Sequence, residues 1–449
     1  MDMQGRKVVV VGSGVSGIGA ATLLSRTGAN VCVYDGNVRL TVESIQEKLP
    51  VDGVEVVIGD MPQKLVEETE LLVISPGVPI DSEVVLKFQN AGIPVWGEIE
   101  LAYNYEQGNV YAITGTNGKT TTTSLVGEIM KNYNNKTFVV GNIGNSYTGE
   151  VLNTSKDSIT VAEISSFQLE TVHEFKPVGT AILNITPDHL NRHYTMENYI
   201  AVKESITKNQ DENGFCVLNY DDKVLREFGA TIKNPVYFSR KDKPQKGAYL
   251  ENNRIKYTDG VVVRDLLDIR EMRLFGNHNY ENVMAAICLT INAGVPVDII
   301  VDTIKSFKGV EHRIEYVREK DGVVYYNDSK GTNPDSSIKA LEAMTRPTIL
   351  IAGGYDKHSE FDEFIDTFKD TVKLLVLIGA TSGQIEETAI AHGFTQIIKA
   401  DNLCEAVNIC AENAVSGDAV LLSPACASWD MFENYEQRGN LFKEYVSKL

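Results

Sequence analysis

Apolar runs alternate with amphipathic stretches along the whole chain, and glycine or polar turns separate them. This pattern predicts a first series of buried strands at Val8–Val11, Val31–Tyr34, Leu71–Ser75 and Val95. A second series follows at Val110–Thr114, Phe138–Val140, Ile159–Glu163 and Thr180–Ile185, and a third at Val323–Asn327, Thr348–Ala352, Leu374–Ile378 and Ala419–Ser423. Because strands that alternate with helices form parallel sheets covered by helices, we expect an α/β fold with three domains, each built on a mainly parallel sheet.

Two segments between the series set the expected domain boundaries. Gly97–Asn109 is rich in tyrosine and acidic residues and joins the first two series, and Lys308–Val310 precedes the third. We therefore expect domains at residues 1–98, 99–309 and 310–449. Between Val236 and Leu274 the pattern changes to short β-like runs with polar turns, which predicts a ribbon at the edge of the middle sheet.

Composition narrows the class of protein. The 449 residues suit three domains of about 150 residues each. A net charge of −19 argues against nucleic-acid binding, which needs clustered positive charge. We see no signal peptide and no apolar stretch of the roughly 20 residues that a membrane span requires. The six cysteines are scattered and show no metal-binding spacing, which suits a reducing cytoplasm. We therefore expect a cytoplasmic protein without membrane insertion. We also expect a monomer.

A first glycine loop, Gly12–Gly17, follows a predicted strand and opens a helix, and Asp35 ends the next strand. This arrangement matches the dinucleotide fingerprint, in which glycines make the turn, the helix N-terminus binds phosphate and the acid binds ribose. Alone it favours an NAD enzyme over a tight turn without a ligand. The same geometry accepts any nucleotide diphosphate, so the nucleotide stays open.

A second glycine loop, Thr114–Thr120, also lies between a strand and a helix. Its backbone N–H groups can hold phosphates, Lys119 can neutralise them and the Thr120 hydroxyl can bind Mg²⁺. The loop departs from the usual form because Ile113 stands where the first glycine is expected. We expect ATP here, rather than a chance Gly-Lys-Thr, and expect one apolar face on the helix at Leu125, Val126, Ile129, Met130 and Tyr133.

Polar residues follow the other strands of the middle series. Glu163, Asp188 and His189 come at or after strand ends, and in a parallel sheet such ends line one crevice. Glu163 could bind Mg²⁺, although a capping or surface acid is the alternative. For His189 a structural histidine is at least as good an interpretation, and Lys203 by itself reads as a solvated helix lysine.

Three polar loops follow strands of the third series. They span Asp328–Asn333, Gly353–Lys357 and Ser423–Ser428. Each could be turn chemistry, but together they predict a binding face. Two of them carry a lysine, which suits a dicarboxylate such as an acidic amino acid.

Taken together, the motifs of this chain resemble those of the Mur ligases of peptidoglycan synthesis. They are most similar to the motifs of the branch that adds D-glutamate. The matching runs are TGTNGKTT (114–121), GNIGN (141–145), AEISSFQLE (162–170), NITPDHLNRH (184–193), NDSKGTN (327–333), GGYDK (353–357) and LSPACASWDMF (421–431). The resemblance covers all three predicted domains in the family's order. It implies a Rossmann-like N-terminal domain, a P-loop ATPase-like central domain and a Rossmann-like C-terminal domain.

The activity implied by the resemblance is ATP-dependent amide formation. The carboxylate of UDP-N-acetylmuramoyl-L-alanine would accept the γ-phosphate of ATP to give an acyl phosphate, and the amine of D-glutamate would then attack it. Negative charge gathers among these groups, so the site must supply positioned cations. Domain closure would assemble the site.

The resemblance also implies roles for individual residues. Lys119, Glu163, His189, Lys203 and Lys330 would be catalytic. The ATP site would comprise Gly115, Thr116, Asn117, Gly118, Lys119, Thr120, Thr121, Asn279, Arg313 and Asp328. Thr120 and Glu163 would bind one Mg²⁺, while His189 and a carbamylated Lys203 would bind a second.

The two remaining substrates receive residues in the same way. The UDP-linked substrate would contact Val15, Ser16, Asp35, Ser75, Pro76, Gly77, Asn142 and His189. D-Glutamate would contact Thr332, Lys357, Ser428 and the backbone near Tyr435. Some relatives place Thr-Arg after the ribose acid, whereas this chain has Gly36-Asn37, so contacts there are not carried over.

Three other functions remain open on the residues alone. A nicotinamide-dependent oxidoreductase would use the first loop, and a nucleotide-binding switch would bind ATP without forming product. A folylpolyglutamate-type ligase shares the ATP loop and glutamate addition, but its pterin substrate needs no UDP-like first domain.

Overall fold

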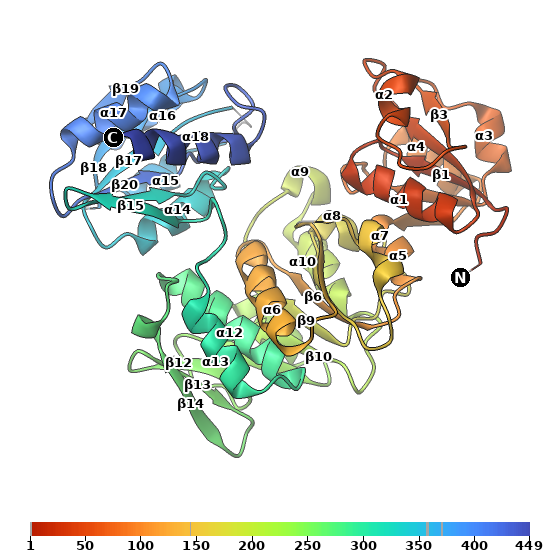
Figure 1. Ribbon diagram of the computed structural model, residues 1–449, viewed down its shortest axis with the longest axis horizontal. Helices are drawn as coiled ribbons and strands as arrows, with labels where there is room; N and C mark the ends of the chain where they lie inside the picture. The colour runs from red at the N-terminus through yellow and green to blue at the C-terminus, as the bar shows by residue number, and fades with distance from the viewer. Residues whose placement is uncertain (1, 144, 356–358, 370) are drawn as a thin grey trace. The chain divides into compact units, whose positions relative to one another are not determined.

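The computed structural model describes residues 2–143, 145–355, 359–369 and 371–449. The chain forms two compact units, one of residues 1–272 and 281–307, the other of residues 273–280 and 308–449. Helix α12 (Asn277–Asn292) begins in the second unit and continues into the first. Three sheets, each with flanking helices, confirm the predicted α/β class (Figure 1).

The first sheet has five parallel strands in the order β3-β2-β1-β4-β5. Its strands are β1 (Lys7–Val11), β2 (Asn30–Asp35), β3 (Glu55–Ile58), β4 (Leu71–Ile74) and β5 (Val95–Gly97). Its helices are α1 (Val15–Arg26), α2 (Val42–Gln46), α3 (Gln63–Glu68), α4 (Glu83–Asn90) and α5 (Glu98–Tyr103). Alternate strand residues pack against α1 on one face and against α3 and α4 on the other. Both faces are therefore buried, as the continuous apolar runs predict.

The second sheet, also in the first unit, has the order β14-β13-β12-β11-β10-β9-β6-β8-β7. Its parallel strands are β6 (Asn109–Thr114), β7 (Thr137–Gly141), β8 (Ile159–Glu163), β9 (Gly179–Ile182), β10 (Phe215–Asn219), β11 (Pro235–Ser239) and β12 (Gly247–Glu251). β13 (Arg254–Thr258) and β14 (Val263–Asp268) complete an antiparallel edge. The predicted edge ribbon is therefore confirmed.

Helices cover both faces of the second sheet. They are α6 (Lys119–Tyr133), α7 (Tyr147–Glu150), α8 (Ser166–Leu169), α10 (Met196–Glu204), α11 (Lys223–Gly229) and α13 (Val297–Ser306), besides α12, while the short α9 (Leu190–His193) packs on α10. α13 packs on α6 (Figure 1). On α6 the predicted apolar residues are buried except Tyr133, which is 46% exposed because it is the last residue of the helix.

The third sheet, in the second unit, has the order β15-β16-β20-β17-β18-β19. Its strands are β15 (Glu315–Lys320), β16 (Val323–Asn327), β17 (Thr348–Ala352), β18 (Val372–Leu377), β19 (Ile397–Lys399) and β20 (Ala419–Leu422), of which β15 alone is antiparallel. Helices α14 (Pro334–Ala343), α15 (Asp362–Asp366) and α16 (Ser382–Ala391) cover one face. α17 (Leu403–Asn413) and α18 (Tyr435–Lys448) cover the other.

Two chain-wide properties agree with the sequence. All six cysteines are free thiols, and five of them are buried. In the described part of the chain, no helix combines the length and the apolar character needed to cross a membrane.

Candidate active site

The second glycine loop connects β6 to α6 and requires glycine at two positions. Gly115 and Gly118 have φ angles of +149° and +84°, which other residues rarely adopt. A Cβ atom at Gly118 would lie 2.2 Å from Asn282 Oδ1, and one at Gly115 would lie 3.0 Å from the Leu183 side chain. The backbone therefore approaches its neighbours too closely for any larger residue.

The segment that leaves β9 holds this loop in place. Thr116 N donates to Asn184 O at 2.9 Å, and Asn117 N donates to Asn184 Oδ1 at 2.8 Å. Thr116 Oγ1 accepts from Thr186 N at 3.0 Å. Loop and segment thus form one hydrogen-bonded layer at the carboxyl end of the sheet.

Two lysines converge on one carbonyl oxygen of this loop. Lys119 Nζ donates to Gly115 O at 2.9 Å, and Lys203 Nζ donates to the same oxygen at 2.8 Å. Lys203 is only 1% exposed. Burial, and secondly the charge of Lys119, lowers its pKa well below the ordinary lysine value. The Lys119 ammonium can therefore bind an anion beside Gly115, while burial favours the uncharged form of Lys203.

Glu163 ends β8 and pairs in register with Ile113, two residues before Gly115. The side chain is 1% exposed, and its Oε1 accepts from Asn142 Nδ2 at 2.8 Å. Within the described residues, the other oxygen, Oε2, is buried without a hydrogen-bond partner. A buried carboxylate oxygen left in this way suits a divalent cation, so this residue fits the expected Mg²⁺ site.

His189 stands at the start of α9 in the left-handed region, with φ at 53°. Its Nε2 lies 3.5 Å from Asp188 Oδ2, and its ring packs against Phe167 at 4.8 Å between centroids. The side chain is 48% exposed. Across residues 2–143, 145–355, 359–369 and 371–449, no three His, Cys, Asp or Glu side chains form a metal-binding group. Magnesium characteristically takes one or two carboxylates together with phosphate oxygens, so one carboxylate does not exclude it.

The first glycine loop connects β1 to α1. Gly12 has φ at +99°, and a Cβ atom there would lie 2.7 Å from Ser75 Oγ. Asp35 Oδ2 accepts from Ser13 N at 3.0 Å and from Ser13 Oγ at 2.6 Å. Burial raises the pKa of Asp35, but the hydrogen bonds from Ser13 and Asn37 outweigh burial, so the net pKa lies below its ordinary value. Asp35 is therefore an anion at neutral pH.

The start of α1 is open to a ligand. Gly14, its N-cap residue, makes no side-chain capping hydrogen bond, and Val15 is 77% exposed. The N–H groups of the first turn therefore lack a capping side chain, as a phosphate site requires. Ser75-Pro76-Gly77 follows β4, the strand beside β1, which brings it to the same edge.

Glu98 is a residue near this loop that sequence reasoning missed. It is 2% exposed at the start of α5, accepts a hydrogen bond from Ser16, and accepts from Thr148 Oγ1 at 3.2 Å. Its Oε2 and the Oγ of Ser75 are both buried without partners among the described residues. The sequence signal at this position is a glutamate-rich helical run, EIELA. Such a run usually indicates a helix face exposed to solvent.

In the second unit, Asn279 and Arg313 line one cavity of about 420 Å³. Asn279 Nδ2 donates to Phe275 O at 2.8 Å. The Phe275 and Tyr326 rings, 5.3 Å apart, also line this cavity. Aromatic rings beside an amide and a guanidinium suit a flat nitrogen heterocycle that carries phosphate.

Asp328, expected at the nucleotide, is fully buried in this structure. Its Oδ1 accepts from Ile314 N at 3.2 Å and its Oδ2 from Ser423 Oγ at 2.7 Å. Burial raises its pKa to about 6, against the opposing charge of Arg313. Asp328 thus joins two loops of the third sheet through both carboxylate oxygens.

The residues expected to bind an acidic amino acid lie on neighbouring loops. Lys330 Nζ stands 5.5 Å from the centre of the Tyr435 ring, and Thr332 N donates to Lys330 O at 2.9 Å. Ser428 is 2% exposed and accepts from Phe432 N at 2.8 Å. The strands β16, β20 and β17, which precede these loops, are neighbours in the sheet. Lys357 lies outside the described residues.

Arg438 links these loops and was also missed. It is fully buried on α18, and its guanidinium donates to Ser329 O at 2.8 Å and to Cys426 O at 3.2 Å. Burial lowers its pKa to about 10. An arginine in a polar helix reads as exposed, so no signal in the sequence marked it.

Comparison with known proteins adds three family models. Residues 6–97 match the Mur ligase MurD-like N-terminal domain, residues 113–290 the Mur ligase middle domain, and residues 312–426 the Mur ligase glutamate ligase domain. Their order follows the order of the three sheets.

Full-length relatives carry one name. The chain is 62% identical over 450 residues to a UDP-N-acetylmuramoylalanine–D-glutamate ligase of Lachnospira eligens, covering all of both chains. It is 46% identical to the protein of that name from Clostridioides difficile, again over the whole of both. Among solved structures, UDP-N-acetylmuramate-alanine ligase MurC of Thermotoga maritima is similar, with a TM-score of 0.63, 17% identity and coverage of 98% and 99%. MurF ligase of the same organism, in complex with ADP, has a TM-score of 0.60, 20% identity and coverage of 100% and 96%, so both show the fold.

Proposed function

This chain belongs to the Mur ligase family, and we propose that it joins D-glutamate to UDP-N-acetylmuramoyl-L-alanine with cleavage of ATP to ADP and phosphate. The reaction is a step of peptidoglycan precursor synthesis. The observation that carries the chemical part is the pair of lysines on Gly115 O, one strand away from the unpartnered carboxylate oxygen of Glu163. It places the Lys119 cation, the Lys203 amine and a carboxylate that can bind a metal ion at one end of the sheet.

The ATP phosphates bind along the loop Gly115–Thr121, where backbone N–H groups and Lys119 face the negative charge. Thr120 and Glu163 would hold a Mg²⁺ ion, which would supply positive charge beside the phosphates. Asn279, Arg313 and Asp328 serve the rest of the nucleotide, and the aromatic cavity of the second unit supports the assignment of Asn279 and Arg313.

Lys203 is proposed to be carbamylated, and its environment supports this. The buried amine has a pKa well below the ordinary lysine value, so its uncharged, nucleophilic form is favoured. That form attacks CO₂ and releases a proton, which leaves a carbamate with one negative charge. The carbamate and His189 would hold a second Mg²⁺ ion.

The residues for the UDP-linked substrate belong to the first unit, and those for D-glutamate belong to the second. Val15, Ser16, Asp35, Ser75, Pro76 and Gly77 hold the UDP-linked substrate, with Asn142 and His189 at its alanyl end. Thr332, Lys357, Ser428 and the backbone near Tyr435 hold D-glutamate. The open start of α1 supports the first set, and the neighbouring loops of the third sheet support the second.

A carboxylate is a poor electrophile, so the alanyl carboxylate first takes the γ-phosphate of ATP. The D-glutamate amine then attacks the acyl carbon, loses a proton, and phosphate leaves to give the amide. Lys119 and Lys330 stabilise the charge that builds on the transferring and departing phosphate.

We also propose domain boundaries near residues 98 and 309, a monomer, and a cytoplasmic location, where ATP is available.

Phosphate release in the presence of ATP, Mg²⁺ and UDP-N-acetylmuramoyl-L-alanine tests the proposal. D-Glutamate, L-glutamate and a diamino acid are compared as acceptors. Release with D-glutamate alone, together with the matching amide product, is expected. Absence of release with all three, with turnover of NAD or folate substrates instead, would overturn it.

A further inference from the structure

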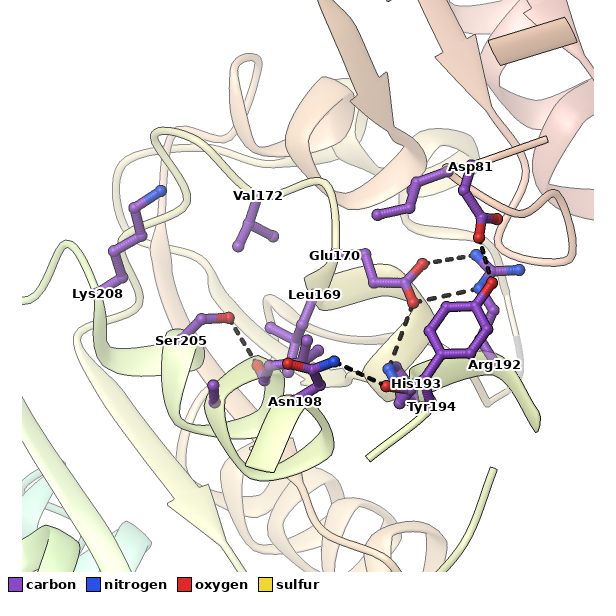
Figure 2. Close-up of a pocket in the computed structure, with 13 residues that line it drawn as sticks. Asp81, Leu169, Glu170, Val172, Arg192, His193, Tyr194, Asn198, Ser205 and Lys208 are labelled. Carbon is purple, nitrogen blue, oxygen red and sulfur yellow. Dashed lines mark hydrogen bonds and ion pairs between the residues drawn. The ribbon is translucent and has the colours of Figure 1, made fainter. Parts of the chain in front are cut away.

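Arg192, on the short helix α9, makes an ion pair with Glu170 at one end of a cavity of about 500 Å³ in the first unit (Figure 2). Its Nε donates to Glu170 Oε1 at 3.2 Å and its Nη2 to Glu170 Oε2 at 2.5 Å. The two side chains are 11% and 5% exposed. Such a two-point contact fixes the plane of the guanidinium as well as its position.

The same guanidinium reaches the loop that follows β4 of the first sheet. Arg192 Nη2 donates to Val78 O at 2.9 Å, and Val78 directly follows the turn Ser75-Pro76-Gly77. A second link lies nearby, because Tyr194 OH donates to the Asp81 carboxylate (Figure 2). The segments 189–194 and 75–81 are therefore joined at two points.

The Phe167 ring lies between Arg192 and His189 and links them. The guanidinium lies 4.9 Å from the centre of the Phe167 ring, and that ring packs against His189 at 4.8 Å. His193 completes the group, with Nδ1 3.5 Å from Glu170 Oε1 and Nε2 3.0 Å from Ser166 Oγ. The guanidinium therefore contacts Val78, which follows the Ser75–Gly77 turn, and Phe167, which packs against His189.

We propose that Arg192 is a positioning residue that holds the Ser75–Gly77 turn at a fixed distance from His189. It touches no substrate itself, and it acts through Val78 O on one side and through Phe167 on the other. Its effect is on the UDP-linked substrate, whose two ends meet these two segments, and not on ATP. This inference rests on the proposed function, because that function places the substrate there.

Substrate affinity measured by calorimetry tests the inference directly. Arg192→Met removes the donors while its stem still covers Phe167, and we expect UDP-N-acetylmuramoyl-L-alanine to bind about tenfold more weakly. We expect KM for ATP to stay within about twofold, because the acceptors that Arg192 loses, Glu170 and Val78 O, lie outside the ATP loop. Arg192→Lys keeps the charge without the fork of donors, so its affinity should fall between the two.

Arg226→Met is the matched control. Arg226 donates to Tyr220 O at 2.6 Å and stacks over the Tyr220 ring at 5.3 Å, so it matches the backbone and ring contacts of Arg192 within the first unit. It joins no proposed substrate segment, and the affinity for the UDP-linked substrate should not change. A purely structural role for Arg192 would lower the folded fraction and the maximal rate of Arg192→Met and leave its affinity for the UDP-linked substrate unchanged.

Arg192→Met leaves Glu170 buried and unpaired, which could prevent folding. The double variant Arg192→Met/Glu170→Gln removes that charge and must show the same weakened binding. Wild-type affinity in a folded double variant would overturn the positioning role while the proposed function stands. Failure of the wild-type chain to bind UDP-N-acetylmuramoyl-L-alanine would overturn the proposed function and this inference together.

Discussion

The two glycine loops of the first unit share a backbone design and differ in charge. Each follows a parallel strand and opens a helix, and each needs glycine at a position with positive φ. In the first loop, the nearby carboxylate of Asp35 is satisfied by Ser13 of the loop itself. In the second, two lysines share one carbonyl and Glu163 keeps a buried oxygen without a partner among the described residues. The backbone geometry of both loops suits phosphate binding. The lysines and the buried carboxylate beside the second loop suit that loop to phosphoryl transfer as well.

The largest effect that this comparison predicts is that of Lys119→Ala. Removing this cation should reduce turnover by about 10³-fold or more, since it faces charge that develops during transfer. Phosphate release with all substrates present measures the loss. The fold should persist, because the hydrogen bonds from Lys119 to Gly115 O and Thr116 O lie within its own loop.

Binding of the UDP-linked substrate is the control for Lys119→Ala, because the first loop is untouched and its affinity should be unchanged. Near-normal turnover in this variant would contradict the assignment of the second loop to ATP.

The next effect belongs to the first loop. Asp35→Asn removes the anion that accepts from Ser13, so KM for the UDP-linked substrate should rise about tenfold while kcat stays within about twofold. Steady-state kinetics at saturating ATP give both values. A fall in kcat like that of Lys119→Ala would show that the two loops do not divide binding from chemistry.

A buried acid outside both loops should affect stability alone. Glu100 is fully buried and accepts from the backbone N–H groups of His173, Glu174 and Phe175 at 2.8, 2.8 and 3.2 Å. Glu100→Gln loses a charged acceptor and should destabilise the fold by about 2 kcal/mol, which thermal unfolding would detect as a lower Tm. The kcat at 25 °C should not change, and Glu83→Gln, at a residue 88% exposed, is the neutral control.

The smallest effect is a pH dependence in the second unit. His392 Nδ1 lies 2.7 Å from Asp366 Oδ1 and its Nε2 3.0 Å from Asp362 Oδ1, and these hydrogen bonds, Asp366 first, raise its pKa. A raised folded pKa adds stability that is fully present below the unfolded value of about 6.5 and is lost as pH rises through the folded pKa.

Tm values of wild type and His392→Asn at pH 5.5 and pH 8.5 check this sign. Wild type should be more stable than the variant at pH 5.5 by a small margin, and the difference should vanish at pH 8.5. An equal difference at both pH values would mean that the histidine acts by packing and not by charge.

Central strands were predictable from the sequence because they are buried on both faces. β1, β6 and β17 are largely apolar runs, and each pairs in parallel with its neighbours. β3 and β15 were not expected, since most of their residues are half-exposed and their composition resembles that of loops. β10 was missed although its run, FCVLN, is fully buried and carries the same signal as its neighbours.

The site divides in the same way. Glycine loops and strand-end residues such as Glu163 are visible in sequence because their position along the chain fixes their place in the sheet. Glu98, Arg192 and Arg438 were not visible. Their partners are hydroxyls, carboxylates and backbone carbonyls from distant segments, and a charged residue on a helix reads as solvated unless that packing is known.

The second unit is discontinuous, and this affects the order in which the protein can be made. Residues 273–280 belong with 308–449, and Phe275 packs against Tyr326 across that gap in the sequence. During synthesis at about 5–20 residues per second, the short segment waits roughly 10 to 30 s before the last strand and helix leave the ribosome. The first unit can fold in that interval, and Phe275 stays uncovered until Tyr326 and the rest of the core that it packs against have been made. Translation speed over residues 308–449 therefore sets how long an apolar side chain is open to aggregation, and a fragment that begins at residue 308 would lack part of its own core.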